Sequence, residues 1–204
     1  MKRGAIVLCG GQSTRMGHDK ASLPFGDETM LQRVVRLLGT VVPPEFIVVV
    51  GARDQVLPAL PATVTVVRDA RDARGPLEGM AAGLRGTKPD VAAVYITSGD
   101  VPLLEPAFVE FLFGQLDDYT IAVPVDGEFH HPLAAVYRTT VLSAVESLLA
   151  VDRLRPRFLF DEVRTREVPV EALRAVDPEL KTLANLNRPE EYQRARRDAG
   201  IHPA

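Results

Sequence analysis

A short apolar run that ends at two consecutive glycines constrains the fold of this chain most. Residues 6–8 are Ile-Val-Leu, and Cys9, Gly10 and Gly11 follow directly. The run is too short to form one face of a helix and is typical of a strand buried on both sides in a parallel sheet. Glycines carry no side chain that would keep a ligand away from the backbone, and they allow positive φ where the chain turns. The sequence therefore predicts a first buried strand that ends at a binding loop.

The polar residues after the glycines indicate which kind of ligand this loop binds. Residues 12–14 are Gln-Ser-Thr, whose backbone N–H groups can point at an anion, and Arg15 and Lys20 add positive charge. The loop lacks the Gly-Lys-Ser/Thr ending of a Walker A motif and the G-x-G-x-x-G spacing of a dinucleotide fingerprint, so both are excluded. We therefore predict a nucleotide triphosphate loop of another kind. The alternative is a turn with basic residues on a solvated surface.

Residues 8–20 also resemble a known signature. The pattern L-x-G-G-x-S-x-R-M-G-x-D-K is similar to that of the nucleotidyltransferases related to molybdenum cofactor guanylyltransferase. The resemblance implies that the loop wraps the triphosphate of GTP and that Lys20 contacts phosphate. Related cytidylyltransferases usually carry Ala-Ala-Gly where this chain has Cys-Gly-Gly, so the resemblance favours guanine over cytosine. The matching residues are Leu8, Gly10, Gly11, Ser13, Arg15, Met16, Gly17, Asp19 and Lys20, and Cys9 is a small apolar departure.

The composition describes an ordinary globular chain. Its 204 residues are 46% hydrophobic and 25% charged, and no Gly/Ser/Pro-rich linker divides them, so we expect one domain with one substantial core. The formal net charge of -3 argues against nucleic acid or an acidic membrane as a partner. One cysteine, Cys9, can form neither an internal disulfide nor a multi-thiolate metal site. The first apolar run is too short for a signal peptide or a membrane span, so the cytoplasm is expected.

Strand-like and helix-like segments alternate along the chain. This alternation predicts a single α/β domain in which a mostly parallel sheet carries helices on both faces, with ligands beyond the carboxyl ends of the strands. The resemblance implies a three-layer, Rossmann-like fold of the nucleotide-diphospho-sugar transferase type. The expected strands are residues 6–8, 46–50, 64–67, 91–97, 121–125 and, at an edge, 164–170. The expected helices are residues 30–38, 108–116, 140–149 and 152–160, with others opening at Pro76 and Pro189 and charged or helical material at residues 53–60.

Residues 75–79, Gly-Pro-Leu-Glu-Gly, form a second block of interest. Pro76 suits the first turn of a helix, because its missing N–H would be unpaired there anyway. Gly79 and Gly83 lie four residues apart on one face, and tight packing on the sheet is one explanation of both. The resemblance implies a second one, since the G-P-L-x-G block of the family helps to enclose the nucleotide. It assigns this role to Gly75, Pro76, Leu77, Gly79 and an upstream aspartate, with Asp69 preferred to Asp72.

Asp100 directly follows the expected strand at residues 91–97. A triphosphate in the first loop would repel this carboxylate unless a cation lay between them, and Mg²⁺ is the expected cation. The alternative is an N-cap or turn aspartate before the next helix. The sequence Gly-Asp-Val-Pro resembles the metal-binding block of the family, which implies that Asp100 is the metal ligand.

The second half of the chain carries two further blocks of the resemblance. His131, Pro132 and the following leucine are similar to a block near the acceptor molecule, whereas adjacent histidines on a strand point to opposite faces and do not suit one metal ion. Asn185 and Asn187 belong to an N-x-N-x-P-E pattern that is expected to bring an amide to the active site. Of the two, Asn185 is preferred for the metal–phosphate region.

The resemblance spans residues 8–192 and implies a specific reaction: transfer of GMP from GTP to Mo-molybdopterin, with release of pyrophosphate. Arg15, Lys20 and Asp100 are the implied catalytic residues. Residues 1–102 would bind GTP and Mg²⁺, residues 103–195 the acceptor, and residues 196–204 would form a mobile tail. Transient contacts with molybdenum insertion and acceptor enzymes are also expected.

Two alternatives stay open at this point. The family often has an asparagine after the second strand, where this chain reads Gly-Ala-Arg-Asp at residues 51–54, so Arg53 substitutes or the contact is missing. A cytidylyltransferase or sugar-phosphate nucleotidyltransferase of the same fold is therefore one alternative. A non-catalytic nucleotide-binding module is the other.

Overall fold

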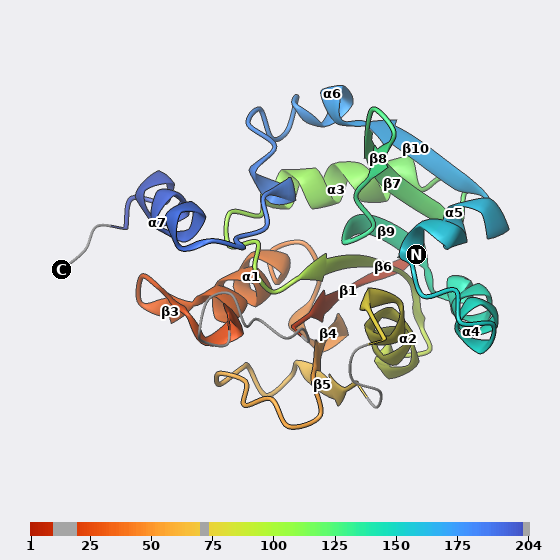
Figure 1. Cartoon of the computed structure of the whole chain (residues 1–204), viewed down its shortest axis with the longest axis horizontal. Coiled ribbons are helices and arrows are strands. Elements are labelled where there is room, and N and C mark those ends of the chain that lie inside the picture. The colour runs from red at the N-terminus through yellow and green to blue at the C-terminus, as the bar shows by residue number, and fades with distance from the viewer. Residues whose placement is uncertain (10–19, 70–73, 202–204) are drawn as a thin grey trace.

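A computed structural model of the chain describes residues 1–9, 20–69 and 74–201. Within these ranges an eight-stranded sheet runs in the order β10-β7-β9-β6-β1-β4-β5, with β8 paired to β7 (Figure 1). Strands β1, β4, β5 and β6 are mutually parallel neighbours, and β10 is parallel to β7. Strand β9 runs antiparallel between β6 and β7. The strands are β1 Lys2–Leu8, β4 Ile47–Gly51, β5 Thr65–Arg68, β6 Val91–Ser98, β7 Ile121–Asp126, β8 Phe129–His130, β9 Ala134–Arg138 and β10 Thr165–Pro169.

Helices cover both faces of this sheet (Figure 1). Alternate residues of β1 face opposite ways: Ala5 and Val7 belong to one buried cluster and Ile6 and Leu8 to the other. Helices α1, α3 and α6 pack on the first face, and α2, α4 and α5 pack on the second. The fold is therefore the expected three-layer α/β arrangement. The helices are α1 Met30–Leu38, α2 Pro76–Gly86, α3 Pro106–Gln115, α4 Leu142–Ala150, α5 Leu159–Glu162, α6 Val170–Leu173 and α7 Pro189–Asp198.

Local sequence signals set several of these boundaries as expected. Thr29 and Gln32 form the capping box of α1, in which the Thr29 hydroxyl accepts from the Gln32 N–H and the Gln32 side chain accepts from the Thr29 N–H. Gly39 follows the last residue of α1, and Pro76 opens α2. Strand β10 lies at the edge of the sheet, as expected for residues 164–170.

Two expected helical segments differ in the structure. Residues 152–160 do not form one helix, because Asp152 has a φ of 60° and Arg155, which precedes Pro156, is extended. Only a 3₁₀ turn, Pro156–Phe158, and the single turn α5 remain there. Residues 53–60 contain no helix either, and Pro58 removes one of the backbone donors that a helix would need. None of the described helices is both long and apolar enough to span a lipid bilayer.

A third, smaller cluster joins the segment around residues 25–30 to the C-terminal part of the described chain. The two-stranded hairpin of β2 Pro24–Phe25 and β3 Glu28–Thr29 packs with α7, which lies away from the main sheet in Figure 1. Its buried members are Phe25, Met30, Leu186 and Ala195, and Ile201 packs against them. Residues 196–198, which the sequence analysis assigned to the tail, belong to α7.

Gly83 permits the close contact between α2 and the sheet. A Cβ atom at Gly83 would lie 2.4 Å from Ile6 Cγ2 and 3.2 Å from Val50 Cγ2. Real side chains do not approach so closely, so a larger residue would push α2 away from strands β1 and β4. Packing therefore accounts for this glycine.

Replacing Gly83 with alanine is expected to lower the free energy of unfolding by about 1–3 kcal/mol, because the added methyl overpacks a rigid interface. Urea unfolding followed by circular dichroism measures this change. Gly114→Ala in α3 is the matched control, since nothing lies within 4 Å of its added Cβ. An equal loss in both variants would contradict the packing account.

Candidate functional site

The carboxyl ends of the central strands meet at one edge of the sheet. The N–H of Cys9 donates to the carbonyl of Val50 at 2.8 Å, and the N–H of Gly99 donates to the carbonyl of Leu8 at 2.9 Å. These bonds extend the pairing of β1 with β4 and β6 by one residue, past Leu8 of β1 and Ser98 of β6. An added Cβ at Gly99 would lie 2.9 Å from Cys9 Sγ, so the glycine allows the two strand ends to approach.

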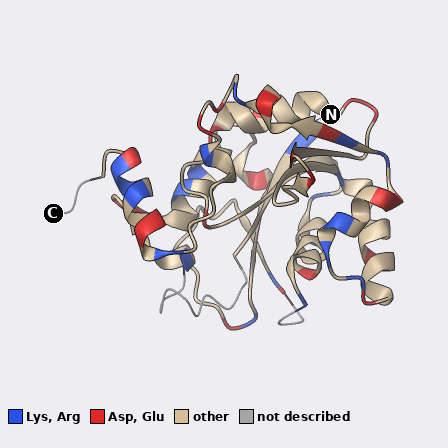
Figure 2. Ribbon diagram, turned by 45° about the horizontal axis from the view of Figure 1, so that its top comes forward, with Lys and Arg blue, Asp and Glu red and all other residues tan. Residues whose placement is uncertain are grey.

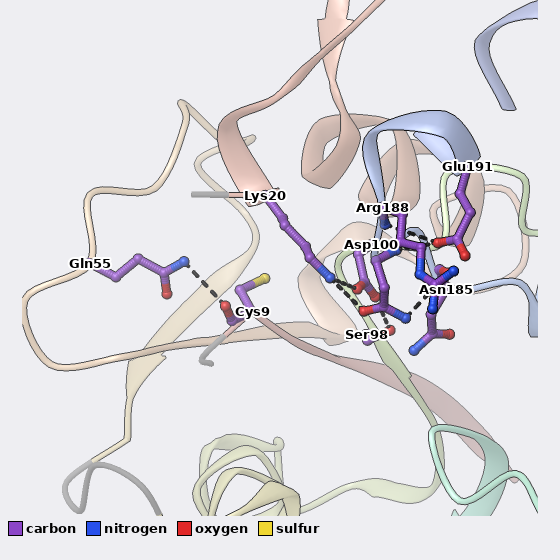
Figure 3. A network of polar contacts seen from close by, with 9 residues as sticks. Cys9, Lys20, Gln55, Ser98, Asp100, Asn185, Arg188 and Glu191 are labelled. Atoms are coloured by element: carbon purple, nitrogen blue, oxygen red, sulfur yellow. Dashed lines mark hydrogen bonds and ion pairs between the residues drawn. The ribbon is translucent and has the colours of Figure 1, made fainter. Parts of the chain in front are cut away.

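Lys20 and Asp100 form an ion pair at this edge (Figure 3). Lys20 Nζ donates to Asp100 Oδ2 at 2.9 Å, and each side chain is only 15% exposed. The lysine opens a 3₁₀ turn, Lys20–Ser22, while the aspartate follows the end of β6. The structure therefore brings together two of the three residues expected to be catalytic.

Two further contacts fix the position of Asp100. Ser98 Oγ donates to Asp100 Oδ1 at 2.6 Å, so each carboxylate oxygen accepts a hydrogen bond. The carbonyl of Asp100 accepts from the N–H of Leu186 at 3.1 Å. The sequence analysis did not assign a role to Ser98, although its place two residues before Asp100 at a strand end is a usable signal.

An amide from the end of the chain completes the cluster. Lys20 Nζ also donates to Asn187 Oδ1 at 2.7 Å, and Asn187 Nδ2 donates to the carbonyl of Asn185 at 3.5 Å. The expected amide thus reaches the site, but the side chain in contact with Lys20 is that of Asn187 and not the preferred Asn185. Leu186, which lies between the two asparagines, is buried in the cluster that contains Phe25.

Gln55 is a contact that the sequence analysis missed. Gln55 Nε2 donates to the carbonyl of Cys9 at 3.2 Å, and Gln55 Oε1 accepts from the N–H of Ala52 at 3.0 Å (Figure 3). An amide after β4 therefore holds the residue from which the first loop departs. It lies one position beyond the segment in which the family asparagine was sought. Arg53, considered there as a substitute, is exposed.

The second block lies at the same edge. Gly75 has a φ of 79° and forms the N-cap of α2, with Pro76 exposed beside it. Leu77 is fully buried, and an added Cβ at Gly79 would lie 3.5 Å from Leu8 Cδ2. Asp69 follows β5, and its N–H donates to the carbonyl of Gly51 at 2.8 Å.

The acceptor block also reaches this edge, from the antiparallel strand. Strand β9 begins at Ala134 opposite Thr97, so His131 and Pro132 precede it at the end where β6 leads to Asp100. The His131 ring lies edge-on to Phe129, with ring centroids 4.9 Å apart. The carbonyl of Pro132 accepts from the Tyr137 hydroxyl at 2.8 Å.

Several predicted contacts lie outside the described residues. Gly10, Gly11, Ser13 and Arg15 belong to the first loop, and Asp72 belongs to the segment before α2. The described residues on either side of these gaps all lie at the carboxyl edge of the sheet.

The described oxygen atoms fit one kind of metal site. Among the described residues, no group of three or more His, Cys, Asp or Glu side chains converges. The oxygens around Lys20 come from the Asp100 carboxylate and the Asn187 amide. Mg²⁺ prefers oxygen and is often held by one or two carboxylates plus substrate phosphates and water. The donors therefore fit magnesium carried largely by a nucleotide and do not fit an all-protein cage.

Comparison with known families gives the class of this protein. The family model described as MobA-like NTP transferase domain matches residues 5–167, so the fold and its site are those of a nucleotidyltransferase. The chain belongs to the MobA-like NTP transferase family.

Individual relatives agree with this assignment. A probable molybdenum cofactor guanylyltransferase of Methanosarcina acetivorans is 32% identical over 94% of this chain and 88% of the relative. One of Mycobacterium tuberculosis is 35% identical over 89% of this chain and 87% of the relative. Among solved structures, molybdopterin-guanine dinucleotide biosynthesis protein A of Archaeoglobus fulgidus superposes with a TM-score of 0.76 at 20% identity, covering 99% of this chain and 100% of that one. A cytidylyltransferase of Thermus thermophilus has a TM-score of 0.71 at 14% identity, covering 98% and 100%. The last two likenesses concern the fold alone.

His131 gives a pH-dependent prediction. Burial lowers the pKa of His131, and the nearby His130 acts in the same direction while Asp126 opposes it. The unfolded chain then binds the proton more readily than the folded chain, so stability is lost as the pH falls below about 6.5. In His131→Gln this part of the loss should disappear. Urea midpoints at about pH 7.5 and about pH 5.5 test it, and equal pH dependence in both proteins would contradict it.

Proposed function

We propose that this protein transfers GMP from GTP to the terminal phosphate of Mo-molybdopterin and releases pyrophosphate. Its relatives of 32% and 35% identity are named probable molybdenum cofactor guanylyltransferases, which supports this acceptor and this nucleotide. The observation that carries the proposal is the cluster of Lys20, Asp100 and Asn187 at the carboxyl edge of the sheet. In open α/β sheets, ligands bind at this edge.

The reaction needs positioning and charge stabilisation more than it needs a nucleophilic side chain. An oxygen of the acceptor phosphate forms a bond to the α-phosphorus of GTP, and the bond from that phosphorus to the bridging oxygen of pyrophosphate breaks. The acceptor phosphate is already ionised at neutral pH, so no strong general base is required. The protein must hold the two phosphates in line and offset the developing charge.

Among the described residues, Lys20 is the cationic side chain best placed to offset the charge on the phosphates. In the structure its ammonium group is shared between Asp100 and Asn187, so both partners hold it at the strand ends. A triphosphate at the edge would accept from the same ammonium group. Arg15 and the backbone of Gly10, Gly11 and Ser13 would bind the remaining phosphate oxygens, as the signature implies.

Asp100 would hold magnesium through its carboxylate, with Ser98 orienting that carboxylate. When bound, Mg²⁺ neutralises charge on the phosphate oxygens. Lys20 would then release Asp100 and turn to phosphate. Because opposite charges stay paired before and after this exchange, neither side chain is left buried and uncompensated.

The second block and the acceptor block complete the proposed substrate contacts. Gly75, Pro76, Leu77, Gly79, Leu8, Cys9 and Asp69 would enclose the nucleoside, and His131, Pro132 and the Asn185 region would face the acceptor. The parallel β1, β4 and β6 strand ends support the first group, and the start of β9 beside β6 supports the second. Such a reaction would take place in the cytoplasm, with transient contacts to the enzymes that insert molybdenum and receive the finished cofactor.

Asp100→Asn is expected to lower kcat about 100-fold or more while changing GTP affinity much less, since charge compensation is needed most in the transition state. Pyrophosphate release from GTP and Mo-molybdopterin measures kcat. Calorimetric titration with GTP measures affinity. Turnover equal to that of the wild type would remove Asp100 from the proposed mechanism.

The base preference is tested by thermal unfolding with Mg²⁺ and each of GTP, CTP, UTP and ATP. Because ligand binding raises the unfolding midpoint, GTP should give the largest shift. A larger shift with CTP or UTP would favour a cytidylyl or sugar-phosphate transferase instead. Lys20→Met should reduce the GTP shift, whereas Lys88→Met, in a lysine that lies over the Phe46 ring, should not.

A further inference from the structure

The partner that positions Lys20 from the end of the chain is itself held in place. Asn187 lies 167 residues after Lys20, on a short segment that connects Leu186 to α7. Leu186 is 4% exposed, and its N–H donates to the carbonyl of Asp100. One side of the segment is thus fixed to the strand end, and the other side depends on α7.

Glu191 fixes that second side. Glu191 Oε2 accepts from the N–H of Asn187 at 2.7 Å and from the N–H of Arg188 at 3.0 Å. Figure 3 shows this carboxylate beside the site cluster and one turn into α7. These two N–H groups lie before the first turn of the helix, where no helical carbonyl can accept from them.

The charge state of Glu191 suits this role. Hydrogen bonds from the N–H groups of Asn187 and Arg188 lower the pKa of Glu191, so the carboxylate is ionised at neutral pH. A negative charge at a helix N-terminus is also favourable. Figure 2 colours acidic and basic residues along the α7 ribbon, and Glu190 is the acidic residue next to Glu191.

The same helix is attached to the segment that carries Lys20. The Tyr192 hydroxyl donates to the carbonyl of Pro24, and the Tyr192 ring lies 6.3 Å from that of Phe25. One residue, Leu23, separates Pro24 from the 3₁₀ turn Lys20–Ser22. Helix α7 therefore contacts both the segment that carries Lys20 and the segment that carries Asn187.

We propose that Glu191 is a positioning residue for the transferase reaction, which holds the Asn187 amide against the Lys20 ammonium group. Glu191 accepts from the backbone of Asn187 and Arg188, and it acts on Lys20 through Asn187. The inference rests on the proposed function, because it requires Lys20 to bind the nucleotide. It adds a role for a carboxylate that contributes no ligand to the metal.

The test measures the dissociation constant of GTP by calorimetry with the full chain, excess Mg²⁺ and no acceptor. Glu191→Ala should weaken GTP binding about tenfold, and Glu191→Gln, which keeps an acceptor oxygen, should stay within about twofold of the wild type. Glu190→Ala is the matched control and should not change the dissociation constant. Circular dichroism of each variant monitors the helix content of α7. If Glu191→Ala loses helix, the GTP dissociation constant of Glu191→Gln becomes the deciding measurement.

A double-mutant cycle separates positioning from general loosening of the fold. Asn187→Ala removes the amide but keeps the backbone N–H that Glu191 accepts from, so adding Glu191→Ala should cause no further loss. Additive losses of GTP affinity, or unchanged GTP binding in Glu191→Ala, would overturn this inference and leave the proposed function standing. A wild-type chain that binds no GTP would overturn the proposed function and this inference with it.

Discussion

The contact between Lys20 and Asp100 is the interaction on which the site depends. The two residues are 80 positions apart, and the ion pair forms only because β6 ends beside β1 and the 3₁₀ turn after the first loop returns to that edge. Both side chains are largely shielded from water, so each would be costly to leave unpaired. The Asn187 amide and the Ser98 hydroxyl satisfy the remaining hydrogen-bonding groups and give the pair one geometry.

Features with local causes could be predicted from the sequence. The strand at residues 6–8, the capping box of Thr29 and Gln32, and the helix that opens at Pro76 each follow from neighbouring residues. The position of Asp100 at the edge was also predictable, because parallel strands end together and the aspartate comes directly after one of them. The family signature then indicated which chemistry such an edge performs.

Features with distant causes could not be predicted in the same way. Asn187, and not Asn185, contacts Lys20 in the structure. This outcome depends on how the segment packs around Leu186, which is buried in the cluster with Phe25. The bond from Gln55 to the Cys9 carbonyl depends on how residues 52–64 fold back over the strand ends. At residues 152–160 a helix was expected, but Pro156 keeps the preceding Arg155 extended.

The late position of Asn187 in the sequence has a consequence for biosynthesis. Strands β1, β4 and β6 precede residue 100 and α3, β7 and β9 precede residue 140, so most of the sheet can assemble while the remainder is still being synthesised. The amide that steadies Lys20, however, lies 167 residues after it, and it is fixed at the edge only once α7 has been synthesised. A prematurely terminated polypeptide lacking this last segment would retain the sheet strands but hold its essential cation loosely. Synthesis through the end of α7 is thus a condition for an ordered centre in this protein.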